Sequence, residues 1–240
     1  MPRITTISFD GEDTLWSIQP VRASVEERFL DLLKRYAPAD VIRAQLRAEE
    51  ERNARRFGHG ANGFVLSLIE LAIEASRGAI SAAEIGTILR FIDDIADGAV
   101  TLVEGARATL STLALEYTLI LHATGDLLEL EKRIARSGLA DFFDHVRIVS
   151  SKDERAFARL LSRTGVSPGQ LVTVGRSLTS DILPALARGS HAIQISGGPG
   201  AECSRGGGAH GGPEDSPRYR RARQISDLPQ IIGLINAEIG

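Results

Sequence analysis

The sequence predicts an α/β protein: a three-layer arrangement of helices on both faces of a parallel sheet, with an inserted α-helical cap. Two patterns carry this prediction. After Gly98, short apolar runs alternate with helical patterns, and this alternation is typical of parallel strands joined by covering helices. Residues 20–96, by contrast, show helical patterns only. The helical block is therefore expected to interrupt the α/β core as a separate domain.

The first strand is expected at residues 4–9. This apolar run is rich in β-branched residues and ends at Asp10 and Gly11, where turn-forming residues begin. One strand cannot satisfy its backbone hydrogen bonds alone, so it must join the sheet formed later in the chain. The later strands are expected at residues 117–122, 146–149, 171–174 and 192–195.

Helical patterns fill both predicted domains. In the cap they cover residues 21–36, 40–57, 62–76 and 81–94. The last of these begins with Ser81 and Glu84 at capping-box spacing. In the rest of the chain they cover residues 104–115, 126–137, 153–163, 179–188 and 227–239. The predicted domains are a core of residues 1–16 and 98–240 and a cap of residues 17–97.

The composition is that of a globular protein, since 43% of the 240 residues are hydrophobic. The 28 Lys and Arg residues against 31 Asp and Glu give a net charge of −3 without a basic block, so nucleic acid is not an expected partner. Cys203 is the only cysteine, and no apolar run reaches the roughly 18 residues of a membrane span. A cytoplasmic location, without a membrane partner, is expected. The oligomeric state stays open.

Polar residues follow four of the predicted strands at their carboxyl ends. The stretches are DGEDT at 10–14, ATGD at 123–126, SSKD at 150–153 and GRSLTSD at 175–181. Open parallel sheets bind ligands at this edge, because the loops that follow the strands meet there. The sequence therefore predicts a site that combines carboxylates, a threonine hydroxyl and a lysine.

In this order, with a helical block after the first, the four stretches resemble the motifs of the haloacid dehalogenase (HAD) superfamily, most of whose members are phosphatases. The resemblance covers about residues 4–195 and implies a Rossmann-like, HAD-like core. It also implies a hydrolase that removes phosphate from a small phosphorylated metabolite through an aspartyl-phosphate intermediate and uses Mg²⁺. Each motif alone is weak, so the resemblance rests on the ordered set.

The resemblance assigns the chemistry to three residues. Asp10 matches the nucleophile that takes the phosphoryl group. Glu12 matches the acid–base residue, whose backbone carbonyl also binds magnesium, but the family usually places an aspartate there. A glutamate keeps the acid–base group and moves it by about one methylene, and a displacement of about 1 Å can cost roughly 100-fold in rate. Lys152 matches the cation that pairs with the nucleophile and the phosphoryl oxygens.

Thr124 and Gly125 match the residues that bind the phosphoryl group, through a hydroxyl and a backbone N–H at the start of a helix. Thr124 could instead serve only as a helix N-cap. In the last motif, Asp181 matches a magnesium ligand. Where the family usually has an Asp or Asn, this chain has Arg176. One metal ligand is therefore missing, and Mg²⁺ is expected to bind weakly.

Three interpretations of Arg176 stay open. It could point away and leave Asp10, the Glu12 carbonyl and Asp181 as the ligands that hold the metal. It could instead bind phosphate in the metal's place, or it could only form an ion pair with Asp181. Three functions stay open as well: a magnesium-dependent phosphatase, an impaired phosphate-binding or interaction protein, and a metal-independent 2-haloacid dehalogenase. Against the last, such dehalogenases resemble one another in an aromatic residue two places after the nucleophile, where this chain has Glu12.

Two other segments stand out in the sequence. The stretch RRFGHGANGF at 55–64 brings two arginines, a histidine and two aromatic residues to one turn of the cap, which either selects the leaving group or is only a solvated turn. Residues 196–213 are rich in glycine and are expected to form a surface loop. Trp16 is expected to be a packing residue at the hinge between the domains.

Overall fold

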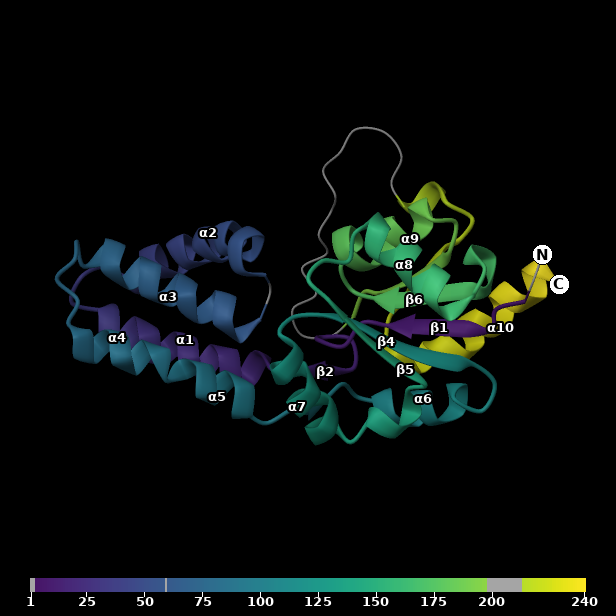
Figure 1. Ribbon diagram of the computed structural model, residues 1–240, viewed down its shortest axis with the longest axis horizontal. Helices are drawn as coiled ribbons and strands as arrows, with labels where there is room; N and C mark the ends of the chain where they lie inside the picture. Colours follow the sequence, from purple (N-terminus) through teal and green to yellow (C-terminus); the bar gives the residue numbers. More distant parts are fainter. Residues whose placement is uncertain (1–2, 59, 198–212) are drawn as a thin grey trace. The chain divides into compact units, whose positions relative to one another are not determined.

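The computed structural model describes residues 3–58, 60–197 and 213–240. Six strands form the main sheet: β1 (Thr6–Phe9), β4 (Thr118–Thr124), β5 (His145–Val149), β6 (Leu171–Gly175), β7 (His191–Ile195) and β8 (Tyr219–Ala222). Their order is β5-β4-β1-β6-β7-β8 (Figure 1). β1 pairs in parallel with β4 and β6, and β7 pairs in parallel with β6 and β8. The predicted α/β class, with a parallel sheet, is confirmed.

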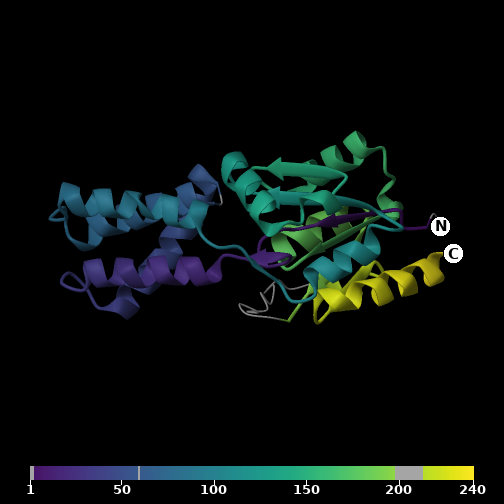
Figure 2. The same cartoon turned by 90° about the horizontal axis from the view of Figure 1, so that it is seen from below.

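Helices cover both faces of this sheet. Helices α8 (Glu154–Thr164) and α9 (Leu183–Ala187) lie on one face, and α6 (Ala106–Leu113) and α10 (Leu228–Ile239) lie side by side on the other (Figure 2). On the first face, Phe157 and Leu160 of α8 pack with Ile120 and Leu171 of the strands. The apolar side of α8 therefore faces the sheet, as in an amphipathic helix that covers one.

The helical block has a hydrophobic core of its own. Its helices are α1 (Gln19–Leu33), α2 (Ala39–Phe57), α3 (Ala61–Ala75), α4 (Ala82–Leu89) and α5 (Phe91–Asp97). Phe29, Leu68 and Phe91 are among the fully buried side chains of this core. A separate core is what an independently packed domain requires.

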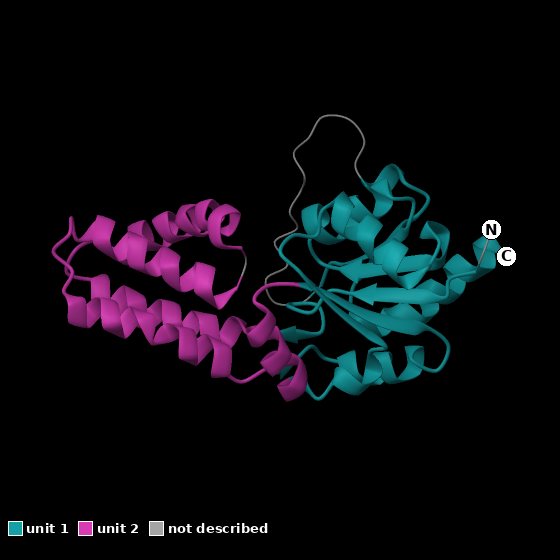
Figure 3. Ribbon diagram, in the orientation of Figure 1, with its two compact units in different colours: residues 1–17, 101–123, 137–240 teal, residues 18–100, 124–136 magenta. Residues whose placement is uncertain are grey.

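The chain divides into two compact units, a core unit of residues 1–17, 101–123 and 137–240 and a helical unit of residues 18–100 and 124–136 (Figure 3). Two short antiparallel strands, β2 (Trp16–Ser17) and β3 (Thr101–Leu102), lie next to the first two of the four crossings between the units. The helical unit contains residues 18–97 of the predicted cap and, in addition, residues 98–100 and 124–136. It includes most of α7 (Leu127–Ser137), which the sequence assigns to the core.

Besides the two-residue strands β2 and β3, which were not predicted, three elements differ from the sequence-based expectations. β8 was not predicted, because its sequence YRRA has no apolar run and only its two end residues are buried. The single helix expected at 81–94 is divided at Arg90 into α4 and α5, although the predicted capping box of Ser81 and Glu84 is present. The helix expected at 179–188 consists of a π-helical turn, η3 (Leu178–Ile182), followed by α9.

Short 3₁₀ turns complete the fold: η1 (Ala140–Phe142), η2 (Pro168–Gln170), η4 (Pro213–Asp215) and η5 (Ile225–Asp227). Most of the glycine-rich loop expected at 196–213, Cys203 included, lies outside the described residues, as does His59. Within the described part of the chain, none of the helices combines the length and the apolar character needed to cross a membrane.

Candidate active site

The loop after β1 is shaped by backbone hydrogen bonds and by one tryptophan. Asp10 follows β1 directly, and its N–H donates to the carbonyl of Val174 on the neighbouring strand (2.9 Å). The N–H groups of Thr14 and Leu15 turn back to the Gly11 carbonyl. A side chain at Gly11 would overlap the ring of Trp16, which is fully buried. Glycine is required here because the tryptophan, as a packing residue, fills the space beside it.

Lys152 joins two carboxylates at the carboxyl edge of the sheet. Its ammonium forms an ion pair with Asp10 and another with Asp181, the latter at 2.7 Å between Nζ and Oδ1. The second oxygen of Asp10 accepts from the hydroxyl of Thr14 at 3.1 Å. Lys152 and Asp181 are buried, with relative exposures of 4% and 2%. Three of the predicted site residues, Asp10, Lys152 and Asp181, are thus brought together from loops far apart in the sequence.

This cluster has two potential anions for one cation. Burial and the neighbouring charges together change the pKa values of Asp10 and Lys152. Burial raises the pKa of Asp10 to about 6, and the neighbouring charge of Asp181 adds to the increase, while Lys152 and the Thr14 hydrogen bond oppose it. The pKa of Lys152 is raised, because the attraction of the two carboxylates outweighs the effect of burial. Lys152 therefore keeps its charge, and Asp10 ionises fully only above about pH 6.

The loop after β6 holds Asp181 in place. The N–H of Ser177 donates to Asp181 Oδ2 at 3.0 Å, and the π-helical turn η3 carries Asp181 back over Gly175. A side chain at Gly175 would overlap Asp181. Both of the Asp181 carboxylate oxygens therefore have a donor, one from Lys152 and one from the loop.

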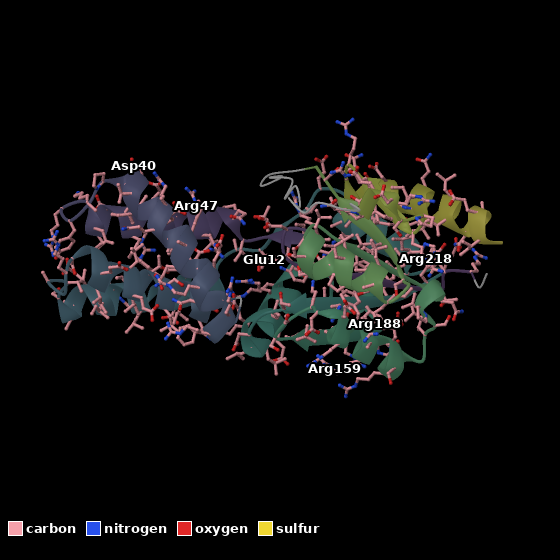
Figure 4. The ribbon with its side chains drawn as sticks, turned by 90° about the horizontal axis from the view of Figure 1, so that it is seen from above. Glu12, Asp40, Arg47, Arg159, Arg188 and Arg218 are labelled. Atoms are coloured by element: carbon pink, nitrogen blue, oxygen red, sulfur yellow. The ribbon has the colours of Figure 1, made fainter. Side chains whose placement is uncertain are left out.

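Arg176 contacts the first motif. Its Nη1 donates to the backbone carbonyl of Asp13 at 3.3 Å, and its own carbonyl accepts from Gln194 Nε2 at 3.0 Å. The ion pair of Asp181 is formed with Lys152 instead. Of the three interpretations, the structure thus gives no support to an Arg176–Asp181 pair and places a guanidinium against the loop that carries Asp10. Figure 4 labels Glu12 on this same loop.

These residues, as arranged, offer an incomplete set of ligands for a magnesium ion. Two of the predicted ligands, Asp10 and Asp181, are paired with Lys152. The position of the usual third carboxylate carries the cation Arg176, which repels a divalent ion. Among the residues that the structure describes, no three His, Cys, Asp or Glu side chains are grouped so that they could hold a metal. The predicted magnesium stays a prediction, as does the predicted ligand role of the Glu12 backbone carbonyl.

The second motif lies between β4 and α7. Thr124 ends β4, and Gly125 has a φ of +145°, a conformation that favours glycine. The helix cap is Asp126, since its carboxylate accepts from the N–H of Glu129 three residues on, at 3.2 Å. Thr124 is therefore not the N-cap of α7, and its hydroxyl is left for another role. Both predicted phosphate-binding residues belong to the helical unit.

A neutral polar patch lies behind the ion cluster, on the face of the sheet covered by α8. Burial lowers the pKa of His122 to about 3, and the charges of Lys152 and Arg159 add to the decrease. Its ring packs edge-on against Phe157 at 5.0 Å between centroids. The hydroxyls of Ser8 and Thr173, register partners on β1 and β6, are buried and have no hydrogen-bond partner in the described structure. His122 thus adds no positive charge beside Lys152.

In the cap turn at 55–64, Arg56 is held by neighbouring side chains of the helical unit. Arg56 forms an ion pair with Glu70 at 3.0 Å and donates to Asn53 at 3.1 Å. Its guanidinium also lies over the ring of Phe57, 4.6 Å from the centroid. Arg56 is therefore part of the packing between α2 and α3, whereas Arg55 remains the candidate for a substrate contact.

Two residues with clear roles here were not predicted. Thr14 lies within the first motif but was given no role, although a hydroxyl four residues after the nucleophile is a detectable signal. Glu129 of α7 is buried, and its carboxylate is paired with Arg133. Its spacing of four residues from Arg133 looks the same in the sequence as an exposed helical pair.

No family model matches this chain, and no curated protein does so either. Solved structures do match. A HAD-like family hydrolase from Xanthomonas campestris is 32% identical over 98% of this chain and 93% of its own, with a TM-score of 0.84. A HAD phosphatase from Thermococcus onnurineus and a 2-haloacid dehalogenase from Pseudomonas syringae are each 21% identical over 96% of this chain and at least 98% of their own, both with TM-scores of 0.64.

The last two matches show the fold alone, and they include both chemistries that the sequence left open. The Xanthomonas protein, in contrast, is 32% identical to this chain over almost its whole length. Together with the Asp10–Lys152–Asp181 cluster at the carboxyl edge of a parallel sheet, this similarity shows that the chain belongs to the haloacid dehalogenase-like hydrolase superfamily.

Proposed function

We propose that this hydrolase is a phosphatase that transfers the phosphoryl group of a small phosphate monoester to Asp10 and then to water. The observation that supports this most is the pair of partners that hold the Asp10 carboxylate. Its oxygens are bonded by Lys152 and Thr14 at the carboxyl edge of the sheet. A phosphate monoester is dianionic, and a carboxylate can approach it only where charge and hydrogen-bond donors compensate the repulsion. Lys152 supplies that charge next to the attacking oxygen.

The proposed reaction has two steps. An Asp10 oxygen attacks phosphorus, the bond from phosphorus to the leaving oxygen breaks, and protonated Glu12 gives its proton to that oxygen. The Glu12 carboxylate then takes a proton from water, and the water oxygen attacks phosphorus and releases Asp10. The Thr124 hydroxyl and the Gly125 N–H are proposed to bind the phosphoryl oxygens.

Magnesium is proposed to bind weakly, because Arg176 stands where a further carboxylate would be needed. The variant with both Glu12→Asp and Arg176→Asp should bind Mg²⁺ more tightly in a calorimetric titration. Its magnesium-dependent turnover should rise by more than the product of the two single effects, since residues that act as a unit are not additive. Tight binding of Mg²⁺ and fast turnover in the unaltered protein would refute this part of the proposal.

One observation favours a second function, a 2-haloacid dehalogenase. Lys152 pairs with both Asp10 and Asp181 and so provides a cation at the nucleophile without a metal ligand set. In that chemistry Asp10 would displace a halide from carbon, and water would then attack the carboxyl carbon of the resulting ester. The presence of Glu12, where an aromatic residue is usual, argues against it.

A single-turnover experiment in ¹⁸O-labelled water separates the two reactions. If water attacks phosphorus, the label appears in the released phosphate and not in Asp10. If water attacks the carboxyl carbon of an ester, the label appears in Asp10, which mass spectrometry of the peptide detects. A panel of small phosphate esters and 2-chloropropionate would serve as substrates. If none is turned over but inorganic phosphate binds, the impaired phosphate-binding protein is the remaining function.

A further inference from the structure

A buried carboxylate links the second motif to the cap turn. Glu129, on the first turns of α7, is 6% exposed. One of its oxygens is paired with Arg133, which is 3% exposed, and the other accepts from the N–H of Ala61 at 3.0 Å. Ala61 is the first residue of α3, so Glu129 binds the N-terminus of another helix.

The N-terminus of α3 has no cap of its own. The preceding residue, Gly60, offers no side chain, and its φ of +144° is one that other residues rarely adopt. A carboxylate from α7 therefore satisfies the first N–H of α3 and interacts favourably with the positive end of the helix dipole. A buried carboxylate without a partner is energetically costly, so the hydrogen bond between Glu129 and the Ala61 N–H stabilises this arrangement.

Gly60 also touches the second motif. A side chain added at Gly60 would lie 3.2 Å from Glu129 Oε2, 3.5 Å from the N of Asp126 and 3.9 Å from the Cα of Gly125. The cap turn therefore lies against the backbone of the loop whose Thr124 and Gly125 are the proposed phosphate-binding groups. The far end of α7 is held as well, since Lys132 and Arg136 both pair with Asp97 at the end of α5.

We infer that Glu129 is a positioning residue for the anion-binding loop: it fastens the start of α7 to the N-terminus of α3 and so fixes the backbone at Thr124–Gly125. This role rests on the proposed function, because it assumes that the loop binds phosphoryl oxygens. It makes the cap turn part of the site's support, so a change at Gly60 or Glu129 alters phosphate binding without touching the substrate.

The chain offers a matched control. Glu49 on α2 is also a buried acid of the helical unit, paired with an arginine three residues on, Arg52. Its other partner is Asn53 on the same helix, at 3.3 Å. Glu49→Gln therefore removes a buried charge of the same unit without changing the α7–α3 contact.

The test compares Glu129→Gln, Gly60→Ala and Glu49→Gln in the full chain by amide hydrogen exchange and by inorganic phosphate inhibition. Exchange at residues 125–127 and at Ala61 should become faster, by roughly tenfold, in the first two variants and stay within about twofold in Glu49→Gln. The inhibition constant of phosphate should rise by roughly tenfold in the same two variants, because a displacement of about 1 Å in a binding group costs that much or more.

Unchanged exchange at 125–127 in Glu129→Gln, or an equal increase in Glu49→Gln, would overturn the inference. Faster exchange with an unchanged phosphate inhibition constant would overturn it too, since the loop would then be loosened without any effect on binding. If the parent protein binds no phosphate, the proposed function fails, while the exchange measurement still decides whether Glu129 fastens the loop.

Discussion

The two units each contain a buried ion cluster, and the two clusters differ in charge balance. In the core unit, Asp10 and Asp181 share the one ammonium of Lys152. In the helical unit, Glu129 pairs with Arg133 and accepts from the backbone N–H of Ala61. The first cluster carries an excess negative charge and the second does not. In the first cluster, burial raises the pKa of Asp10 and the second anion, Asp181, adds to the increase. A carboxylate with a raised pKa is a candidate for chemistry, whereas the Glu129–Arg133 pair joins two helices.

The largest effect should come from removing the reactive carboxylate. Asp10→Asn should lower kcat/KM for a phosphate ester by about 1,000-fold or more, because an amide is nearly isosteric but a poor nucleophile. Stability against urea should be kept, since one of two competing anions is gone. Asp13→Asn is the matched control: Asp13 lies on the same loop with a φ of +57°, which asparagine tolerates. Near-normal turnover in a pure, folded Asp10→Asn protein would refute the mechanism.

Removing the shared cation should be the largest change in stability. Lys152→Met leaves two buried carboxylates without their partner, which should cost roughly 3–5 kcal/mol in the free energy of unfolding. Urea titrations at pH 7 measure this. Adding Asp181→Asn to Lys152→Met should recover part of the loss, because only one anion then remains. If the double variant is less stable than Lys152→Met, charge imbalance is not the reason for the loss.

The next largest effect on stability should come from the pKa shifts of Asp10 and His122, which have opposite directions. Asp10, raised from 3.8 to about 6, contributes stability at low pH that is lost as the pH rises between these values. His122, lowered from 6.5 to about 3, contributes stability at high pH that is lost as the pH falls between them. The two partly cancel between pH 4 and 6, where each changes the free energy of unfolding by at most about 1.4 kcal/mol per pH unit.

A variant that lacks one of these two groups should therefore reveal the pH dependence of stability that cancels in the parent protein. Over pH 4–6, Asp10→Asn should become more stable relative to the parent as the pH rises, and His122→Phe should become less stable relative to it. Chemical unfolding at several pH values measures both. Parallel pH profiles for the parent and both variants would show that neither group titrates in this range.

The smallest effects are expected at the cap turn. Arg56→Ala should lower stability by less than about 1 kcal/mol, because its pair with Glu70 is half exposed. Arg55→Ala should instead change the relative kcat/KM values among phosphate esters more than it changes stability. Equal losses of kcat/KM for every ester would place Arg55 outside substrate selection.

The two clusters also differ in how well the sequence predicts them. Asp10, Lys152 and Asp181 each follow a predicted strand, and the topology of a parallel sheet brings such positions together. Glu129 gave no such signal, because its burial depends on the contact of α7 with α3. β8 was missed for a related reason. An edge strand with charged residues lacks the apolar run by which buried strands are detected.

Contacts within one helical turn were predicted better than contacts between segments far apart in the sequence. The capping box at Ser81 was found from spacing, since its atoms lie within one turn. The contact of Arg176 with the Asp13 carbonyl could not be predicted, because it joins residues 163 positions apart. Such a contact depends on the final shape of two loops.

The pairing of β2 with β3 has a consequence for building chimeras. Ser17 pairs with Thr101, so the points where the chain leaves and re-enters the core unit are adjacent. Such an insertion invites exchange with the cap of a relative by cutting at these two points. An exchange of residues 18–100 alone, however, would separate Ala61 from Glu129 and leave α7 facing a foreign helix. A transplant that preserves the native contacts has to carry residues 124–136 with the cap, although they lie in a different part of the sequence.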